Sequence, residues 1–413
     1  MKCRFTFVLI ILLVLSSSKL SSQNSIGQDS EIKNKSNSIT LKYEYDLGSV
    51  LNNNFLNKVL FGGNIDQGII DDNYNRLNSG ANHLGNDVNV VLQYRKFNNH
   101  FWGMDNVGFS TAMEWHINNN FNFTKDGYSL LMDGNKAFAG KTANLSQTEH
   151  YSLQYSQFKL GLYTKNEAHN SEYGFQISLN FGNQFDAYYT PNAEFYTEPN
   201  GEYVQLKGTF DYSEAASSRL FKGIGTGIDL FYKIEKKQRY NLLFDISNIG
   251  FIYWNSNSLK YNGEENIIFE GIVIDDLFST ENNQTTSIND SLVDYINANG
   301  EVGSFMTFTP MEINIGYEHY VTNNMSVLTK FRHKLISLYS PYYQLGAVYH
   351  INNKYHIGGD VNYGGFTKLN FGLSLCMEIS DNFVLDLRTR YISGLFGQAF
   401  SGIGGIAQIN YKF

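Results

Sequence analysis

The sequence predicts an all-β fold, a transmembrane antiparallel β-barrel of about 14 strands, with a range of 12 to 16. Three observations lead to this prediction. The chain begins with an export signal, its apolar residues alternate with polar ones over strand-length segments, and short turns of similar sequence recur at regular intervals. A soluble β-sandwich shows the same alternation, so the turns and their spacing favour the barrel.

The first segment has the three parts of a secretory signal peptide. Lys2 and Arg4 precede an apolar core from Phe5 to Leu15, and small residues follow up to Ser22. This core is shorter than the roughly 20 residues that a membrane-spanning helix needs. We therefore expect a signal peptide at 1–22, a periplasmic N-terminal segment at 23–37 and a single barrel domain at 38–413. Cleavage removes Cys3 and leaves one cysteine, so no intramolecular disulfide is expected.

The composition favours strands over helices. Aromatic residues make up 15% of the 413 residues and charged residues 17%, with 37 Gly and only 4 Pro. The mean hydropathy of −0.31 is compatible with a membrane barrel, because a membrane strand needs only about 9 to 11 residues with every second one apolar. The net charge of −8 argues against a nucleic-acid partner.

The alternation is strictest in the last third of the chain. From Leu369 to Ile379, apolar side chains occupy every odd position and mostly polar ones every even position. Similar turns recur at 320–325, 349–355 and 377–383, and a looser one follows residue 234. Their spacing of roughly 28 to 30 residues fits hairpins of two membrane-length strands. We place these turns, near 323, 353 and 381, in the periplasm.

The connections at the opposite end are expected to be longer. We place them at 47–86, 117–147, 190–221, 254–308 and 393–402, with two short ones near 339 and 367. One segment conflicts with this scheme, because the Asn-rich residues 116–121 resemble a tight turn. Helices are expected at 126–140 and 287–298, and a protruding hairpin at 195–208 that turns at Pro199. The loop structures either plug the lumen or cover only its rim.

The polar face of the strands offers the candidate functional residues. We expect a set of lumenal charges of mixed sign, at Glu312, Glu318, Lys330, Arg332, Lys334, Glu378, Asp386, Arg388, Arg390 and Lys412. They either line a water-filled path or brace a closed barrel. The aromatic end of the chain, Tyr411 and Phe413, is a candidate signal for the barrel-assembly machinery.

Enzyme signatures are weak. The nine His show no metal-ligand spacing, no nucleophile elbow or phosphate loop occurs, and we expect no catalytic residue, metal or cofactor. A hydrolase that pairs His319 or His333 with a serine is a remote alternative. The other alternative is adhesion through the connection at 254–308, whose acidic residues suit a partner, namely Glu264, Glu265, Asp275, Asp276 and Glu281.

Two segments resemble a known family. The stretches from Leu130 to Thr142 and from Asp245 to Trp254 resemble recurrent segments of Bacteroidota outer-membrane barrels that are catalogued only as a domain of unknown function. The resemblance runs through most of the mature chain and implies a barrel in the lipid of the outer membrane. At the level of architecture the chain is also similar to long-chain fatty-acid transporters and to the barrel shuttle of type IX secretion. We thus expect a channel or carrier for small solutes, or a scaffold with a secretion or surface-complex partner.

Overall fold

The computed structural model describes residues 37–413, apart from 102, 167, 216–219, 237, 271–298, 353, 393 and 395–399. The expected signal peptide and the expected helix at 287–298 lie outside the described residues. The strands are β1 (Asn37–Ser49), β2 (Asn82–Phe101), β3 (Met104–Phe123), β4 (Lys141–Asn144), β5 (Thr148–Asn166), β6 (Ser171–Thr190), β7 (Ala193–Thr197), β8 (Val204–Glu214), β9 (Gly223–Lys236), β10 (Tyr240–Trp254), β11 (Leu259–Phe269), β12 (Glu301–Val302), β13 (Phe305–Phe308), β14 (Glu312–Thr322), β15 (Met325–Lys334), β16 (Ser340–His350), β17 (Tyr355–Gly365), β18 (Leu369–Ser380), β19 (Phe383–Thr389) and β20 (Ile403–Lys412). The helices are α2 (Asn53–Phe61), α3 (Gln67–Arg76), α4 (Lys125–Asp133) and the 3-10 helix η1 (Asn135–Phe138).

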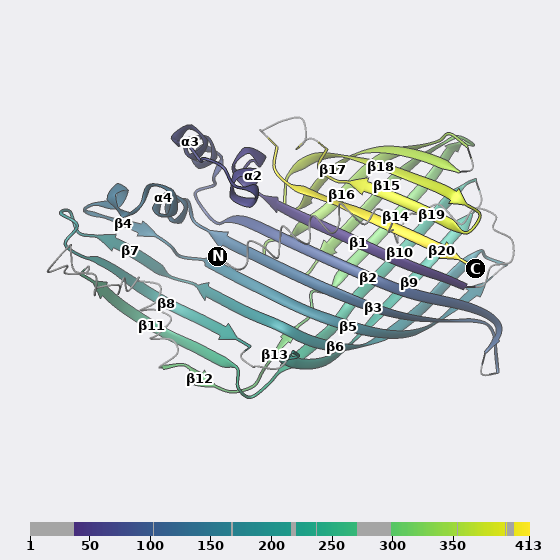
Figure 1. The fold of residues 1–413 in the computed structure, drawn as a ribbon, viewed down its shortest axis with the longest axis horizontal. Helices are drawn as coiled ribbons and strands as arrows, with labels where there is room; N and C mark the ends of the chain where they lie inside the picture. The colour runs from purple at the N-terminus through teal and green to yellow at the C-terminus, as the bar shows by residue number, and fades with distance from the viewer. Residues whose placement is uncertain are drawn as a thin grey trace.

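Fourteen of these strands form a closed antiparallel barrel (Figure 1). Around the barrel the order is β1, β2, β3, β5, β6, β9, β10, β14, β15, β16, β17, β18, β19, β20, and β20 pairs with β1 to close it. The two ends of the chain meet at this seam, where the amide of Phe413 donates to the carbonyl of Asn37 at 3.0 Å. The predicted fold class and strand number are confirmed.

The two ends of the barrel differ as expected. Tight turns join the strands at the end that carries both termini, including the three predicted near 323, 353 and 381. At the opposite end the longer connections carry α2, α3, α4 and the small strands. One boundary is wrong, because β3 continues to Phe123 and the Asn-rich segment 116–121 lies inside it. Asn118 and Asn120 are buried on its inner face, so the polar run follows the lumen instead of turning.

The strands expose apolar side chains and bury polar ones. In β18, Phe371 is 41% exposed, whereas its neighbour on the other face, Asn370, is 1% exposed. A water-soluble protein shows the reverse arrangement, so the outer face of this barrel suits lipid. None of the helices in the described ranges is long and apolar enough to cross a membrane. The chain is thus a transmembrane β-barrel of the kind that the alternation predicts.

Exposed tyrosines form two levels on this outer face. Tyr343 and Tyr363 lie opposite each other toward the long connections, and Tyr349 and Tyr355 lie toward the tight turns. Tyr355 and Tyr363 are separated by eight positions of β17, which is roughly 27 Å along the strand. After correction for strand tilt, this separation is close to the height of the apolar band between the two aromatic girdles of outer-membrane barrels.

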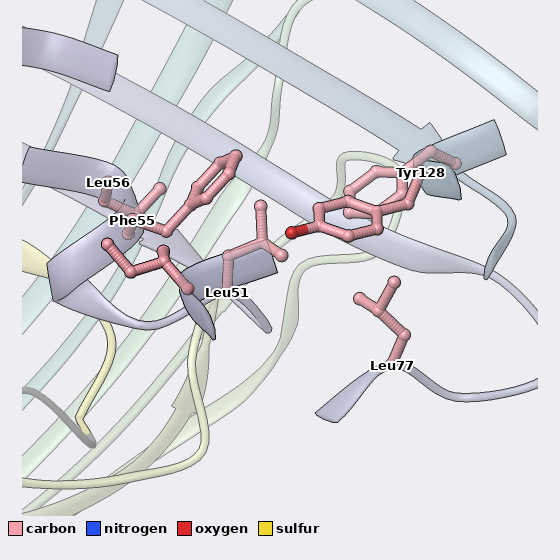
Figure 2. Close-up of a cluster of buried hydrophobic side chains, with 7 residues drawn as sticks. Leu51, Phe55, Leu56, Leu77 and Tyr128 are labelled. Atoms are coloured by element: carbon pink, nitrogen blue, oxygen red, sulfur yellow. The ribbon is translucent and has the colours of Figure 1, made fainter. Parts of the chain in front are cut away.

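The long connections pack into a small domain of their own beyond the strand ends. The expected hairpin is formed by β7 and β8, and the expected helix is α4 together with η1. A buried apolar cluster holds α2, α3 and α4 together (Figure 2), and its members are Leu51, Phe55, Leu56, Ile69, Leu77, Phe123 and Tyr128. Burial raises the pKa of the Tyr128 phenol to about 12, so this group stays protonated within the cluster.

Candidate functional site in the barrel lumen

The predicted charges lie on the inner-face positions of β14, β15, β18, β19 and β20, and Arg390 directly follows β19. The structure brings Glu312, Arg332, Lys334 and Arg390 into one network toward the long connections. Asp386 and Arg388 form a separate pair, with Arg388 donating from Nε at 3.1 Å and from Nη2 at 2.8 Å. Glu318, Glu378 and Lys412 lie closer to the tight turns and outside this network.

The network connects strands on opposite sides of the barrel. Arg332 of β15 pairs with Glu44 of β1 and, at 2.7 Å, with Glu312 of β14. Lys334 pairs with Asp87 of β2. Six steps around the barrel separate β15 from β1, so neighbouring strands cannot account for these contacts. The ion pairs span the lumen.

Arg390 extends the network along the first strand. Its Nη1 donates to Asp46 at 2.7 Å and its Nη2 to Glu44, which also pairs with Lys42 at 2.7 Å. The side chain of Glu44 is 2% exposed and that of Arg332 is 4% exposed. Charges buried to this degree must be compensated by partners, because an ion taken out of water loses several kcal/mol of solvation.

Glu44, Asp46 and Asp87 are not among the residues that the sequence predicted. Their signal was present, because Lys42, Glu44 and Asp46 alternate with Tyr43 and Tyr45 in a polar and apolar pattern like that of the last strands. The pattern alone does not say which of the later strands faces this one across the lumen.

An aromatic layer covers the network at its long-connection side. Phe366, in the connection between β17 and β18, packs onto Gly48 and Gly85, where a Cβ atom would overlap its ring or its Cβ. Its carbonyl oxygen lies 2.8 Å from Nε2 of His83, and Tyr339 contacts its ring edge-on at 5.0 Å between centroids. We call Tyr339, Phe366 and Tyr391 the lid.

The lid is bonded directly to the network. The phenol of Tyr391 donates to Asp46. Burial, and secondly the Asp46 carboxylate, raises the pKa of the Tyr391 phenol, so it remains a donor across the ordinary pH range. The helix α4 packs elsewhere, against α3, η1 and β4, and its Tyr128 lies against Phe55 of α2 and Phe123 of β3.

A second buried polar cluster lies on the inner face of β3, β5 and β9. Lys159 pairs with Asp229 at 2.6 Å and with Glu114 at 3.0 Å, and Glu114 also lies 3.0 Å from Nε2 of His116. The register of β10 shifts between Ile246 and Ile249, which lets the amide of Asn248 donate to Asp229 at 2.7 Å. This cluster was not anticipated, because Lys159 is a single charge in a short apolar alternation.

One amide links the two clusters. Asn314 donates to Asp245 at 3.2 Å and to Glu312 at 2.7 Å, and Asp245 lies on β10 close enough to Asp229 to interact electrostatically. Polar contacts therefore continue from β1 through β15 and β14 to Asp245 of β10, which lies near the second cluster.

Many other polar atoms of the inner wall have no partner within the described part of the chain. They include amide atoms of Asn89, Asn118, Asn120, Asn122, Asn314, Asn362, Gln408 and Asn410. Buried polar groups are rarely left without a hydrogen bond, and water supplies it where the protein does not. The wall of the lumen is thus suited to water or to a polar solute.

The two histidines named for a hydrolase lie outside the lumen. His319 is exposed on the outer face, and His333 pairs with the outward Ile313, so both point away from the lumen. The histidine near a serine is His350, 3.1 Å from Ser326, whose hydroxyl also lies 2.6 Å from Glu318. Among the described residues, no group of three or more His, Cys, Asp or Glu could hold a metal ion.

The adhesion residues and the terminal signal are described only in part. Glu264 and Glu265 lie on β11, beyond the barrel, whereas Asp275, Asp276 and Glu281 fall outside the described residues. Tyr411 and Phe413 stack at 5.6 Å on the outer face at the seam. Their proposed role in assembly stays a prediction.

Comparison with known proteins identifies a family. The model of a Family of unknown function (DUF5723) matches residues 31–385, and no curated protein sequence matches the chain.

Among solved structures, the chain is similar to the toluene transporter TodX of P. putida, with 10% identity, a TM-score of 0.45 and coverage of 92% of this chain and 91% of that one. It is also similar to a Pseudomonas aeruginosa FadL homologue, with 8% identity, a TM-score of 0.43 and coverage of 91% and 89%. The translocator domain of the autotransporter NalP from Neisseria meningitidis is a more distant match, at 7% identity, a TM-score of 0.32 and coverage of 100% and 97%. Similarities this weak carry no information about a ligand.

Proposed function

The chain belongs to the family of unknown function DUF5723, and we propose that this protein is a gated outer-membrane channel for small polar solutes. On this proposal, the described structure is the closed state. The gate consists of the lid and of the ion pairs that Arg332, Lys334 and Arg390 form across the lumen. The observation that carries the proposal is the pairing of Arg332 with Glu44, because it joins strands that face each other across the barrel.

The inner wall supports a path on the tight-turn side of the gate. Gln408 and Asn410 on β20 carry amide oxygens with no partner in the described ranges. A barrel that serves only as a scaffold gains nothing from such groups, whereas a channel uses them to replace the hydration of a passing solute. The gate is then the main barrier between this hydrated wall and the exterior.

The position of Arg390 offers a way to open the gate. Arg390 and Tyr391 begin the connection 390–402, which is held at its far end by Asn53 of α2. The amide of Asn53 donates to the carbonyl of Phe400 at 2.8 Å, and its side chain donates to the carbonyl of Gly402 at 3.0 Å and accepts from the amide of Gly402 at 2.8 Å. We call these three hydrogen bonds the latch, and we expect their loss to loosen the end of the connection that adjoins β20.

The test uses a double variant that removes one cation and one anion together. In Asp46→Asn with Arg390→Gln, Glu44 keeps Arg332 and Lys42 as partners, so no carboxylate of this network is left without a cation. The matched control is Asp72→Asn with Arg76→Gln, which removes an ion pair from α3 outside the lumen. We expect the first variant to raise the conductance of planar bilayers and the swelling of liposomes in small sugars well above the wild type, with the control unchanged.

Folding is checked in the same samples by heat-modifiable migration on denaturing gels. If both variants are folded and neither conducts, the channel proposal is wrong and a scaffold role is favoured. If both conduct equally, the ion pairs of the lumen are not the gate.

A further inference from the structure

One cation on the inner wall has no acidic partner. Lys330 of β15 faces the interior between Gly316 of β14 and Gln344 of β16. Within the described residues, no carboxylate forms an ion pair with its ammonium and no acceptor forms a hydrogen bond with it. Its neighbours Arg332 and Lys334 on the same face each have carboxylate partners. An unpaired interior ammonium is costly unless something compensates it.

The surroundings of Lys330 carry an excess of positive charge. The largest electrostatic effects on it come from Arg332, Arg390, Glu44 and Arg388. Arg388 is neutralised by Asp386. Glu44, the carboxylate among these four groups, is already shared among Arg332, Arg390 and Lys42, so it cannot also neutralise Lys330.

The same side of the lumen has donors without acceptors. Nε of Arg332 is buried and makes no hydrogen bond, and neither does the buried hydroxyl of Tyr339, which interacts electrostatically with Arg332. Lys330 and Arg332 are two positions apart on one face of β15, about 7 Å between Cα atoms. Two adjacent cationic side chains with free N–H groups therefore line one stretch of the wall. Gly316 has no side chain to cover the ammonium from β14.

We propose that Lys330, assisted by Nε of Arg332, binds the carboxylate of a small organic acid inside the lumen. This inference rests on the proposed channel function and narrows its solutes to organic anions. A carboxylate has two acceptor oxygens, which match one ammonium and one guanidinium N–H. The binding site lies just on the tight-turn side of the Arg332 ion pairs, so a bound acid neutralises the excess charge directly below the gate.

The binding test uses two probes of equal chain length and opposite charge, propionate and propylammonium. Saturation-transfer NMR on the detergent-solubilised wild-type barrel is expected to show contact with propionate and none with propylammonium. Lys330→Gln should weaken propionate binding on the order of tenfold, the effect of losing one charge-assisted hydrogen bond. Lys330→Glu should reverse the preference between the probes. The control is Lys354→Gln, which removes an exposed charge in a tight turn and should leave binding unchanged.

The removal of an unpaired cation leaves no carboxylate without a partner, so the Lys330 variants are expected to fold, as heat-modifiability will report. Equal propionate signals in the wild type and in Lys330→Gln overturn the inference. The same substitution in the Asp46→Asn, Arg390→Gln background should lower the permeability of chloride relative to potassium. NMR binding does not require conduction, so the two proposals can fail separately. If the Asp46→Asn, Arg390→Gln variant does not conduct but the barrel still binds propionate through Lys330, the channel is refuted and the binding site is kept. If that variant conducts but no propionate binding depends on Lys330, the binding site is refuted and the channel is kept.

Discussion

The ion pairs of Arg332 allow a quantitative test of the closed lumen. Replacement of Arg332 by Met removes the cation that contacts both Glu44 and Glu312. Breaking a buried pair by removing one partner costs about 3 to 5 kcal/mol, because the remaining charge is left uncompensated. Here the carboxylates keep other partners, since Glu44 retains Lys42 and Arg390 and Glu312 retains Lys334 and Asn314. We therefore expect a loss at the low end, about 3 kcal/mol of unfolding free energy.

A double-mutant cycle separates the pair from the packing of the arginine stem. Glu312→Gln alone leaves Arg332 with Glu44 and should cost about 2 kcal/mol, and the double variant should cost less than the sum of the two. Unfolding is followed by urea titration in phospholipid vesicles, with tryptophan fluorescence and heat-modifiable migration as two readouts. If both single variants cost less than about 1 kcal/mol and their effects add, the pair behaves as a solvent-exposed one. The lumen at this height is then open to water, and the gate proposed above is absent.

Two further changes test the parts that hold the gate. Asn53→Ala removes two side-chain hydrogen bonds to Gly402, so the connection 390–402 should become more sensitive to added protease and the conductance should rise. The control is Asn54→Ala in the same helix. If the rate of cleavage does not change, the latch is contradicted. Gly85→Ala puts a Cβ into the ring of Phe366 and should lower the free energy of unfolding by about 1 to 3 kcal/mol through overpacking. Addition of Phe366→Ala should restore part of that stability in the same urea titration. If the losses of the two variants simply add, the ring does not pack on Gly85.

The barrel could be predicted because its evidence is local. Each strand shows its own alternation, as in Leu369 to Ile379, and each tight turn shows its own polar residues. The one boundary that failed, at 116–121, did so because asparagine suits both a turn and a polar strand face. In this barrel Asn118 and Asn120 line the lumen, and the pairing of β3 with both β2 and β5 outweighs the turn preference.

Only the cations of the candidate site, and not their partners across the lumen, could be predicted from the sequence. Arg332 and Lys334 were recognised as inward charges, but their partners Glu44 and Asp87 are separated from them by more than 240 positions in the sequence. Which inward residues meet depends on barrel closure and on the strand that lies opposite, and neither leaves a local signal. The lid was missed for the same reason, since the ring of Phe366 packs on glycines from β1 and β2.

The lid and the ion pairs depend on each other physically. Attraction between Arg390 and Asp46 is strong only where water is excluded. Two tyrosines exclude water here. Tyr391 of the lid donates a hydrogen bond to Asp46, and the neighbouring Tyr342 has its ring 5.6 Å from the Arg390 guanidinium. The tyrosine hydroxyl in turn needs the carboxylate, since a buried donor without an acceptor is costly. Displacement of either layer weakens the other, so opening should be cooperative, with few partly open states. Water that enters one layer removes the stabilisation of both. A small change in free energy, such as the loss of the Asn53 latch, is therefore enough to open a gate of this kind.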